Sequence, residues 1–124
     1  MKNNNNNFSI RARLSSFKYA FRGLYHVIKN EPNFLIHIVI SIPVIVLGFF
    51  LHISLPDWIA IILCIGLVMV TEILNSAIER LTDMVSPQVS EKAKIVKDIT
   101  ASAVLLAAVT AIITGCMVFI PHIF

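Results

Sequence analysis

Apolar residues fall into three long blocks along the chain, separated by short polar segments. The blocks cover residues 34–55, 58–81 and 99–120. An α-helix needs about 20 apolar residues to cross the hydrocarbon core of a bilayer. Each block is long enough, so the pattern predicts three transmembrane helices. Pro43 and Gly48 interrupt the first block and predict a kink or a close packing point there.

The segment before these blocks predicts a helix with two different faces. Apolar residues recur there at spacings of three and four: Leu14, Phe17, Phe21, Leu24 and Ile28. Basic residues recur at spacings of seven and four: Arg11, Lys18, Arg22 and Lys29. We therefore expect residues 8–30 to form an amphipathic helix on the inner membrane surface, with its basic face toward anionic headgroups. The alternative is that these basic residues only set the topology.

The composition agrees with an all-α integral membrane protein, since 57% of residues are apolar and only 14% are charged. We expect the Asn-rich residues 1–7 to be a disordered tail and residues 31–124 to form the three-span membrane domain.

Cys64 and Cys116 both lie inside apolar blocks and have no Cys or His partner at metal spacing. Neither a disulfide framework nor a zinc site is expected. No Gly-rich phosphate loop or nucleic-acid-binding module is recognisable, so no nucleic-acid partner is expected.

The basic residues predict the orientation in the membrane. All ten Lys and Arg residues lie before the first block, at the end of the second block, or between the second block and the third. The positive-inside rule places these segments in the cytoplasm. The N-terminus is therefore expected inside the cell and the C-terminus outside.

Acidic residues form a stripe at the end of the second block. Glu72, Asn75, Glu79 and Asp83 are spaced by three, four and four residues, which places them on one helix face. Glu72 lies fourteen residues beyond Trp58, about 21 Å at 1.5 Å per residue. This depth corresponds to the inner leaflet, where a charge costs several kcal/mol and usually marks a functional site. The stripe is thus expected to lead from the lipid tails to the cytoplasm.

The residue types in the stripe suggest its chemistry. Asn75 alone would be interpreted as a polar contact between helices. Several carboxylates together suit Mg²⁺, a hard cation that takes oxygen ligands and shares sites with phosphates. A carboxylate shielded from water also suits a general base. Outside the stripe, Glu31 is interpreted as a carboxylate at a helix start, and His37 as a hydrogen-bonded packing residue.

Four segments resemble the small prokaryotic diacylglycerol kinase family, which includes the undecaprenol kinases. They are "SFKYAFRGL", "NEPNFLIH", "EILNSAIERLTD" and "KDITASAV". The resemblance implies a homotrimer of three-span subunits, each with a surface helix, in the bacterial plasma membrane. It also implies Mg²⁺-dependent transfer of the γ-phosphate of ATP to a lipid hydroxyl.

The resemblance assigns roles to the acidic residues. Glu72 matches the catalytic base of the family, and Asn75 matches a supporting polar residue. Glu31 and Glu79 match the carboxylates that hold the metal ions of the nucleotide. These roles agree with the chemistry expected of the stripe.

Further positions match nucleotide-binding residues of the family. Lys97 and Asp98 match a pair that contacts the nucleotide, and Tyr19 matches an aromatic residue on the nucleotide side. Arg13 matches an arginine near the phosphates, with Arg11 as the alternative.

The acceptor lipid and the function class each leave an alternative open. Ala101 replaces a serine of the enterobacterial diacylglycerol kinases, and Leu35 replaces an arginine usual in the undecaprenol-kinase branch. The segments around them favour undecaprenol slightly over diacylglycerol.

A stripe of membrane carboxylates is also typical of a small transporter or a proton-relay subunit. Against this alternative, the acids end in the inner leaflet, and no polar path leads on to Asp57. An anchoring protein would leave the buried Glu72 without a use.

Overall fold

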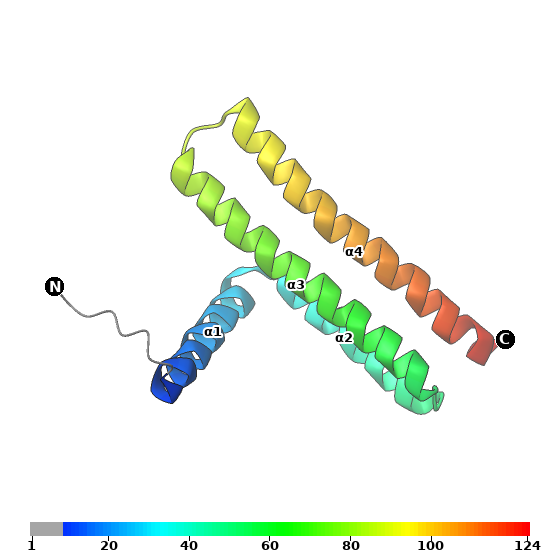
Figure 1. Cartoon of the computed structure of the whole chain (residues 1–124). Helices are drawn as coiled ribbons and strands as arrows, with labels where there is room; N and C mark the ends of the chain where they lie inside the picture. The colour runs from blue at the N-terminus through cyan, green and yellow to red at the C-terminus, as the bar shows by residue number, and fades with distance from the viewer. Residues whose placement is uncertain (1–8) are drawn as a thin grey trace.

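The computed structural model describes residues 9–124, and this part of the chain is helical, with no strand. Its helices are α1 (Ile10–Asn30), α2 (Pro32–Phe50), α3 (Leu55–Val85) and α4 (Glu91–Ile123) (Figure 1). The last three are long and apolar enough to cross a membrane. The prediction of three transmembrane helices is therefore confirmed. The tail expected at residues 1–7 lies outside the described residues, as does residue 8 at the start of the predicted surface helix.

Serine side chains begin three of the helices. Ser9, Ser54 and Ser90 each accept a hydrogen bond from the backbone N–H three residues later, over 3.3, 3.3 and 3.1 Å. Such caps satisfy N–H groups that the first helical turn leaves unpaired. With the cap at Ser90, α4 begins eight residues before the third apolar block. α3 and α4 are thus longer than the blocks 58–81 and 99–120, mainly because they continue through polar residues on the side predicted to be cytoplasmic.

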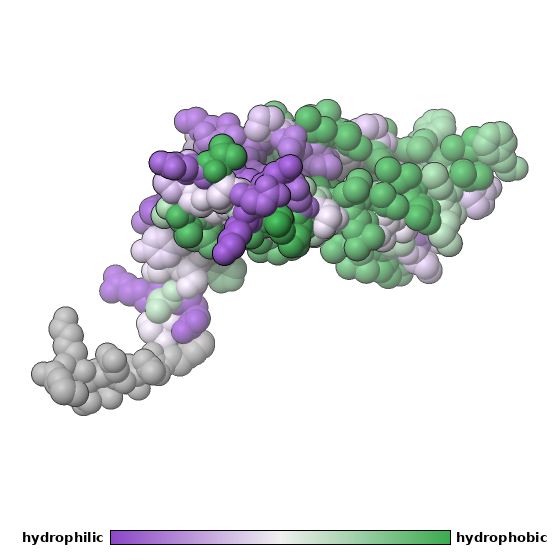
Figure 2. Space-filling view, turned by 90° about the horizontal axis from the view of Figure 1, so that it is seen from above, coloured by the Kyte–Doolittle hydropathy of each residue, from purple (hydrophilic) through white to green (hydrophobic). Residues whose placement is uncertain are grey.

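The helices form an open bundle with a protruding first helix. Figure 1 shows α3 and α4 running antiparallel side by side, with α2 beside the first part of α3 and α1 extending away from the start of α2. The turn between α2 and α3 lies at the same end as the C-terminus, and residues 86–90 lie at the opposite end. Seen from above, hydrophilic residues gather over α1 and the far ends of α3 and α4, while hydrophobic residues cover the rest (Figure 2).

Gly48 allows α2 and α3 to approach closely beside their connecting turn. A Cβ added at Gly48 would lie 2.7 Å from Cη2 of Trp58, which is too close without a shift of the indole ring. The sequence predicted a kink or a packing point at Pro43 and Gly48, and Gly48 is a packing point. The helix α2 continues through Pro43 without a break. The turn itself contains His52 in the left-handed region, at φ 52°.

The core of the single chain is small. Its buried cluster lies near the turn between α2 and α3 and comprises Ile53, Ile61, Val118 and Phe119. Most large apolar side chains of α2, α3 and α4 remain exposed in the single chain. Such a surface is suited to contact with lipid or with other apolar helices.

Candidate functional site

The acidic stripe of α3 becomes more exposed toward the end of the helix. Glu72 is 3% exposed and Asn75 is 8% exposed. One further turn along, Glu79 is half-buried, and Asp83 is exposed. The side chains thus change from buried to solvated over three turns of one helix, in the order expected from the sequence.

His37 of α2 lies next to the most buried member of the stripe. Its Nε2 is 3.7 Å from Oε2 of Glu72, which is within ion-pair distance but too long for a hydrogen bond. The charges of Glu31 and Glu79 also act on Glu72. The structure therefore brings the imidazole of α2 and the carboxylate of Glu72 together, with Glu31 and Glu79 near enough for their charges to act on Glu72. The sequence interpretation of His37 as a packing residue did not include this carboxylate.

Asn75 has a buried oxygen without a partner. Among the described residues, its Oδ1 is the buried side-chain atom that has no hydrogen bond. Buried polar atoms are nearly always hydrogen-bonded, so an unpaired one calls for an explanation. An amide oxygen can accept a hydrogen bond from a hydroxyl or contact a cation. Both kinds of group take part in the transfer of a phosphoryl group to an alcohol.

Two further cations contact acidic residues of the site. Arg80 donates a hydrogen bond of 3.0 Å from Nη2 to Oε1 of Glu31. Lys97 of α4 donates one of 2.6 Å from Nζ to Oδ1 of Asp83, and the charge of Glu79 also acts on Lys97. Sequence reasoning missed Arg80, which was counted only as a topology residue. Arg80 shares with Ile73 and Ser76 the face of α3 that borders α1, and no local sequence pattern indicated which face that is.

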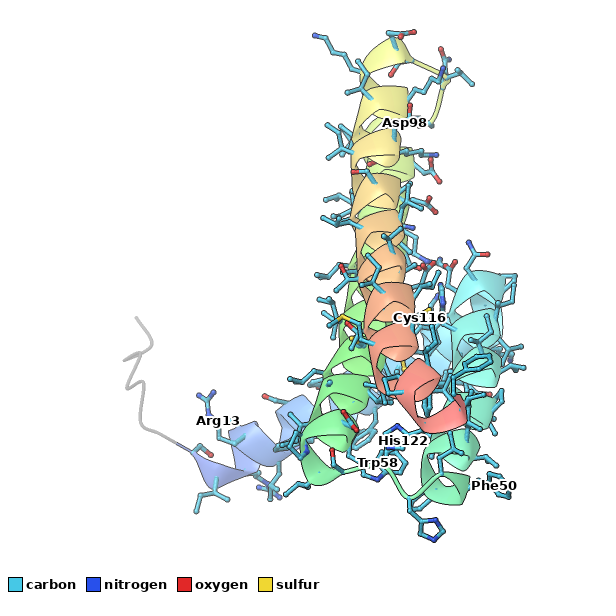
Figure 3. The ribbon with its side chains drawn as sticks, turned by 90° about the vertical axis from the view of Figure 1, so that its right-hand side faces the viewer. Arg13, Phe50, Trp58, Asp98, Cys116 and His122 are labelled. Atoms are coloured by element: carbon cyan, nitrogen blue, oxygen red, sulfur yellow. The ribbon has the colours of Figure 1, made fainter. Side chains whose placement is uncertain are left out.

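Other predicted site residues lie on different parts of the molecule. Figure 3 shows Arg13 on α1 and Asp98 on α4, well separated in the single chain. Tyr19 is 62% exposed on α1, where the guanidinium of Arg22 lies 5.4 Å from its ring centre. Asp98 is exposed, and its direction around the axis of α4 differs from that of Lys97 by about 100°, as for any two successive helical residues. A single chain therefore does not gather all the predicted nucleotide-binding residues.

The donor set fits a divalent cation that is shared with phosphate groups. Within residues 9–124, no group of three or more His, Cys, Asp or Glu side chains forms a cage for a metal. Mg²⁺ usually keeps several waters and binds one or two carboxylates together with substrate phosphates. Mutually repelling carboxylates beside the unpaired oxygen of Asn75 suit such a cation.

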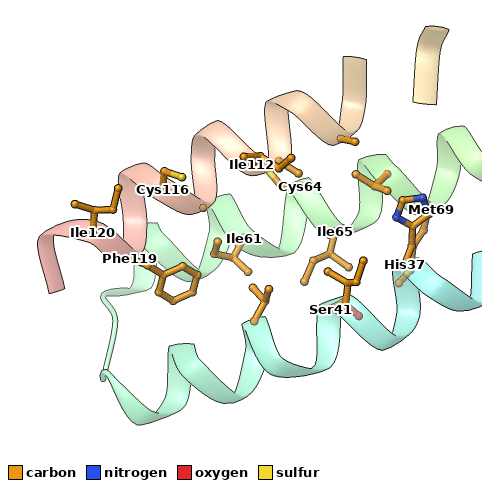
Figure 4. Close-up of a pocket in the computed structure, with 16 residues that line it drawn as sticks. His37, Ser41, Ile61, Cys64, Ile65, Met69, Ile112, Cys116, Phe119 and Ile120 are labelled. Atoms are coloured by element: carbon orange, nitrogen blue, oxygen red, sulfur yellow. The ribbon is translucent and has the colours of Figure 1, made fainter. Parts of the chain in front are cut away.

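An apolar cavity of about 480 Å³ opens between α2, α3 and α4. His37 lies at one end of it and Phe119 at the other (Figure 4). Cys64 and Cys116 line the cavity as free thiols. A Cβ added at Gly115 would meet nothing within 4 Å, so this part of α4 borders the cavity and does not pack closely.

The sequence matches the prokaryotic diacylglycerol kinase family over residues 18–119. It is 35% identical over 108 residues to an undecaprenol kinase of Bacillus subtilis, and this match covers 87% of this chain and 88% of the relative. It is 31% identical over 118 residues to a diacylglycerol kinase of Escherichia coli, and this match covers 95% of this chain and 97% of the relative. A diacylglycerol kinase of Synechocystis is 38% identical over 109 residues, and the match covers 87% of this chain and 62% of that relative.

These matches and the three apolar helices select one of the functions considered from the sequence. They support neither a transporter subunit nor an anchoring protein. The chain belongs to the prokaryotic diacylglycerol kinase family and is a bacterial membrane lipid kinase, a phosphotransferase that acts on an alcohol group.

Proposed function

We propose that this kinase transfers the γ-phosphate of ATP to the hydroxyl of undecaprenol, with diacylglycerol as the alternative acceptor. The observation that carries this proposal is the position of Glu72. It is 3% exposed within an apolar helix, yet it belongs to a stripe of acids that ends in the exposed Asp83. A lipid hydroxyl could approach one end of this stripe from the membrane, and ATP could approach the other from water.

In the proposed reaction, Glu72 is the general base. Its carboxylate accepts the proton of the lipid hydroxyl while the hydroxyl oxygen bonds to the γ-phosphorus. The bond from the γ-phosphorus to the bridging oxygen breaks, and ADP leaves with the electron pair of that bond. Asn75 supports the acceptor, since its unpaired Oδ1 can receive a hydrogen bond from the hydroxyl before the proton moves. Phosphoryl transfer depends mainly on such positioning and on neutralisation of charge.

Glu31 and Glu79 are the proposed ligands of Mg²⁺, which enters with ATP and offsets the negative charge of the phosphates. Glu31 stands at the start of α2, and Glu79 is half-buried on α3. Their charges both act on Glu72, which supports a shared site. The Arg80 contact of Glu31 would open or be shared when the metal binds.

The proposed nucleotide contacts come from α1 and α4. Lys97 and Asp98 lie on the part of α4 before its apolar block, and Tyr19 and Arg13 lie on α1. Lys97 already interacts with the charge of Glu79, so it can reach phosphates held there.

We also propose that the kinase is a homotrimer with active sites between subunits. Two observations support this: the apolar surface of the single chain is largely exposed, and Arg13 and Asp98 are far apart within it.

The N-terminus is proposed to be cytoplasmic, with residues 8–30 as a surface helix and residues 31–124 as the membrane domain. The basic and apolar faces of α1 support its place at the membrane surface.

The preference for undecaprenol rests on the sequence segments around Leu35 and Ala101. Sequence identity does not separate the two lipids, because the undecaprenol kinase of Bacillus subtilis is 35% identical and the two diacylglycerol kinases are 38% and 31% identical. The test is to incubate the purified kinase with γ-labelled ATP and either lipid in identical micelles. We expect a higher kcat/KM for undecaprenol. A higher value for diacylglycerol would reverse the assignment, and no labelled lipid in either reaction would overturn the proposed activity.

A further inference from the structure

His37 occupies a position between the proposed base and the apolar cavity. Its Nε2 faces Oε2 of Glu72 at 3.7 Å, and the same side chain lines the end of the cavity (Figure 4). The His37 side chain is 24% exposed, and that of Glu72 is 4% exposed. Within residues 9–124, no other basic side chain lies within 4 Å of the Glu72 carboxylate.

Buried residues flank His37 along α2. Phe34, His37 and Ser41 are spaced by three and four residues, so they share one face of α2. Phe34 is 2% exposed and Ser41 is 9% exposed, which shows that this face is the packed one. His37 therefore lies on the packed face of α2.

We propose that His37 is a positioning residue, whose Nε2–H holds the Glu72 carboxylate in the orientation that faces the acceptor lipid. This inference rests on the proposed role of Glu72 as general base. A general base must lie within hydrogen-bond reach of the proton that it removes, and its contacts often shorten when the substrate binds. Without a donor, the carboxylate would turn away from Glu31 and Glu79, whose charges repel it.

A packing role for His37 makes a different prediction. One edge of the ring does border the apolar cavity. If that contact were its only role, a leucine of similar volume would preserve both stability and turnover. If the carboxylate contact matters, leucine should preserve stability and reduce turnover.

The test compares His37→Leu and His37→Gln in the full chain, with thermal stability, kcat and the KM for ATP measured on each preparation. We expect His37→Leu to lower kcat by about 10- to 100-fold, the size of a lost contact to a charged group, while the KM for ATP stays within about twofold. His37→Gln should restore part of kcat because its amide can donate to Glu72. Ser41→Ala, on the same buried face, is the control and should leave kcat unchanged.

Two further measurements separate this inference from the role of Glu72. In a Glu72→Gln background, adding His37→Leu should cause little additional loss, because the carboxylate to be positioned is absent. Normal kcat in His37→Leu together with impaired Glu72→Gln would overturn the inference alone. Normal kcat in Glu72→Gln would overturn the proposed base itself.

If His37→Leu does not fold, His37→Asn replaces it, because its shorter amide cannot reach Glu72. Equal kcat in His37→Asn and His37→Gln would then reject the inference.

Discussion

Arg80 of α3 donates a hydrogen bond of 3.0 Å to Glu31, at the junction between α1 and α2. Glu31 is one of the two proposed metal ligands, and it thus already has a cationic partner in the structure. The side chain of Arg80 is half-exposed, so the ion pair should contribute only about 0.2–1 kcal/mol. A contact of this strength can be displaced by a divalent cation.

Replacing Arg80 should therefore make Glu31 more available to the metal. We expect Arg80→Gln to lower the Mg²⁺ concentration needed for half-maximal activity by about two- to fivefold, which corresponds to the strength of an exposed ion pair. The measurement is a Mg²⁺ titration at saturating ATP. Arg22→Gln, a basic residue stacked on Tyr19, is the control and should leave the Mg²⁺ requirement unchanged. An unchanged or higher requirement in Arg80→Gln would argue against competition for Glu31.

Glu72→Gln should lose turnover without losing stability. Glutamine keeps the shape of the side chain and most of its hydrogen bonding but cannot accept the proton, and a general base contributes about 10²- to 10⁴-fold in rate. The substitution also removes a buried charge, so the thermal midpoint should be equal or higher. ATP affinity, turnover and thermal stability are measured on one preparation. Ser76→Ala, 3% exposed on the same helix, is the control for disturbance of a buried polar position.

A purely structural role for Glu72 predicts the opposite pattern. Assembly or stability would then decrease in Glu72→Gln, while the activity per folded molecule would stay close to normal.

Glu79→Gln should affect the metal and the nucleotide. Because one of the two proposed carboxylate ligands loses its charge, we expect most activity to be lost and the affinity for Mg²⁺–ATP to decrease, with assembly preserved. Nucleotide binding by calorimetry and oligomer size by light scattering check both parts. Glu91→Gln, at the exposed start of α4, is the matched control. Near-normal turnover in Glu79→Gln would show that the metal assignment is wrong.

A methyl group at Gly48 should destabilise the protein. The added Cβ would lie 2.7 Å from Cη2 of Trp58, and overpacking of this kind typically costs about 1–3 kcal/mol. Gly66→Ala is a matched control, because its Cβ would meet nothing within 4 Å and alanine is the better helix former. Thermal unfolding in detergent should rank Gly66→Ala at or above the parent and Gly48→Ala below it. Equal midpoints for the two variants would contradict the close approach of α2 and α3.

The proposed orientation places the C-terminus outside the cytoplasm. All ten Lys and Arg residues either precede α2 or lie in the segment from Arg80 to Lys97, at the connected ends of α3 and α4. A reporter that is active only in the cytoplasm should therefore be silent when fused after Phe124, and active when fused before α1. A strong cytoplasmic signal from the C-terminal fusion would reverse the topology and the placement of the site.

Periodicity along one helix was enough to predict the order of the acidic stripe. The spacing of Glu72, Asn75 and Glu79 depends only on helix geometry, and their exposure follows the predicted order from membrane to solvent. The three transmembrane helices were also predictable, because an apolar block of about 20 residues with few charges is typical of a helix that crosses the bilayer. The helix ends were predicted less well, since α4 begins at a serine cap within a polar segment.

Contacts between helices were not predictable from the sequence alone. The pairs His37–Glu72 and Arg80–Glu31 join residues 35 and 49 positions apart, and each depends on how far α2 is rotated and shifted against α3. No local pattern fixes these two quantities, which result from the packing of side chains such as Phe34 and Trp58. The interpretation of His37 as a packing residue was therefore incomplete.

The unequal lengths of α2 and α3 have a consequence for the host membrane. The 19 residues of α2 span about 28 Å, close to the thickness of a hydrocarbon core, whereas the 31 residues of α3 span about 46 Å. The acidic stripe begins at Glu72, which lies level with His37 inside α2, and continues along α3 toward the start of α2, where Arg80 contacts Glu31. Hydrophobic mismatch should therefore act on this enzyme directly, because a thicker bilayer would draw the carboxylates that are proposed to bind the metal toward the acyl chains. Bilayer thickness would then influence turnover independently of the lipid that is phosphorylated.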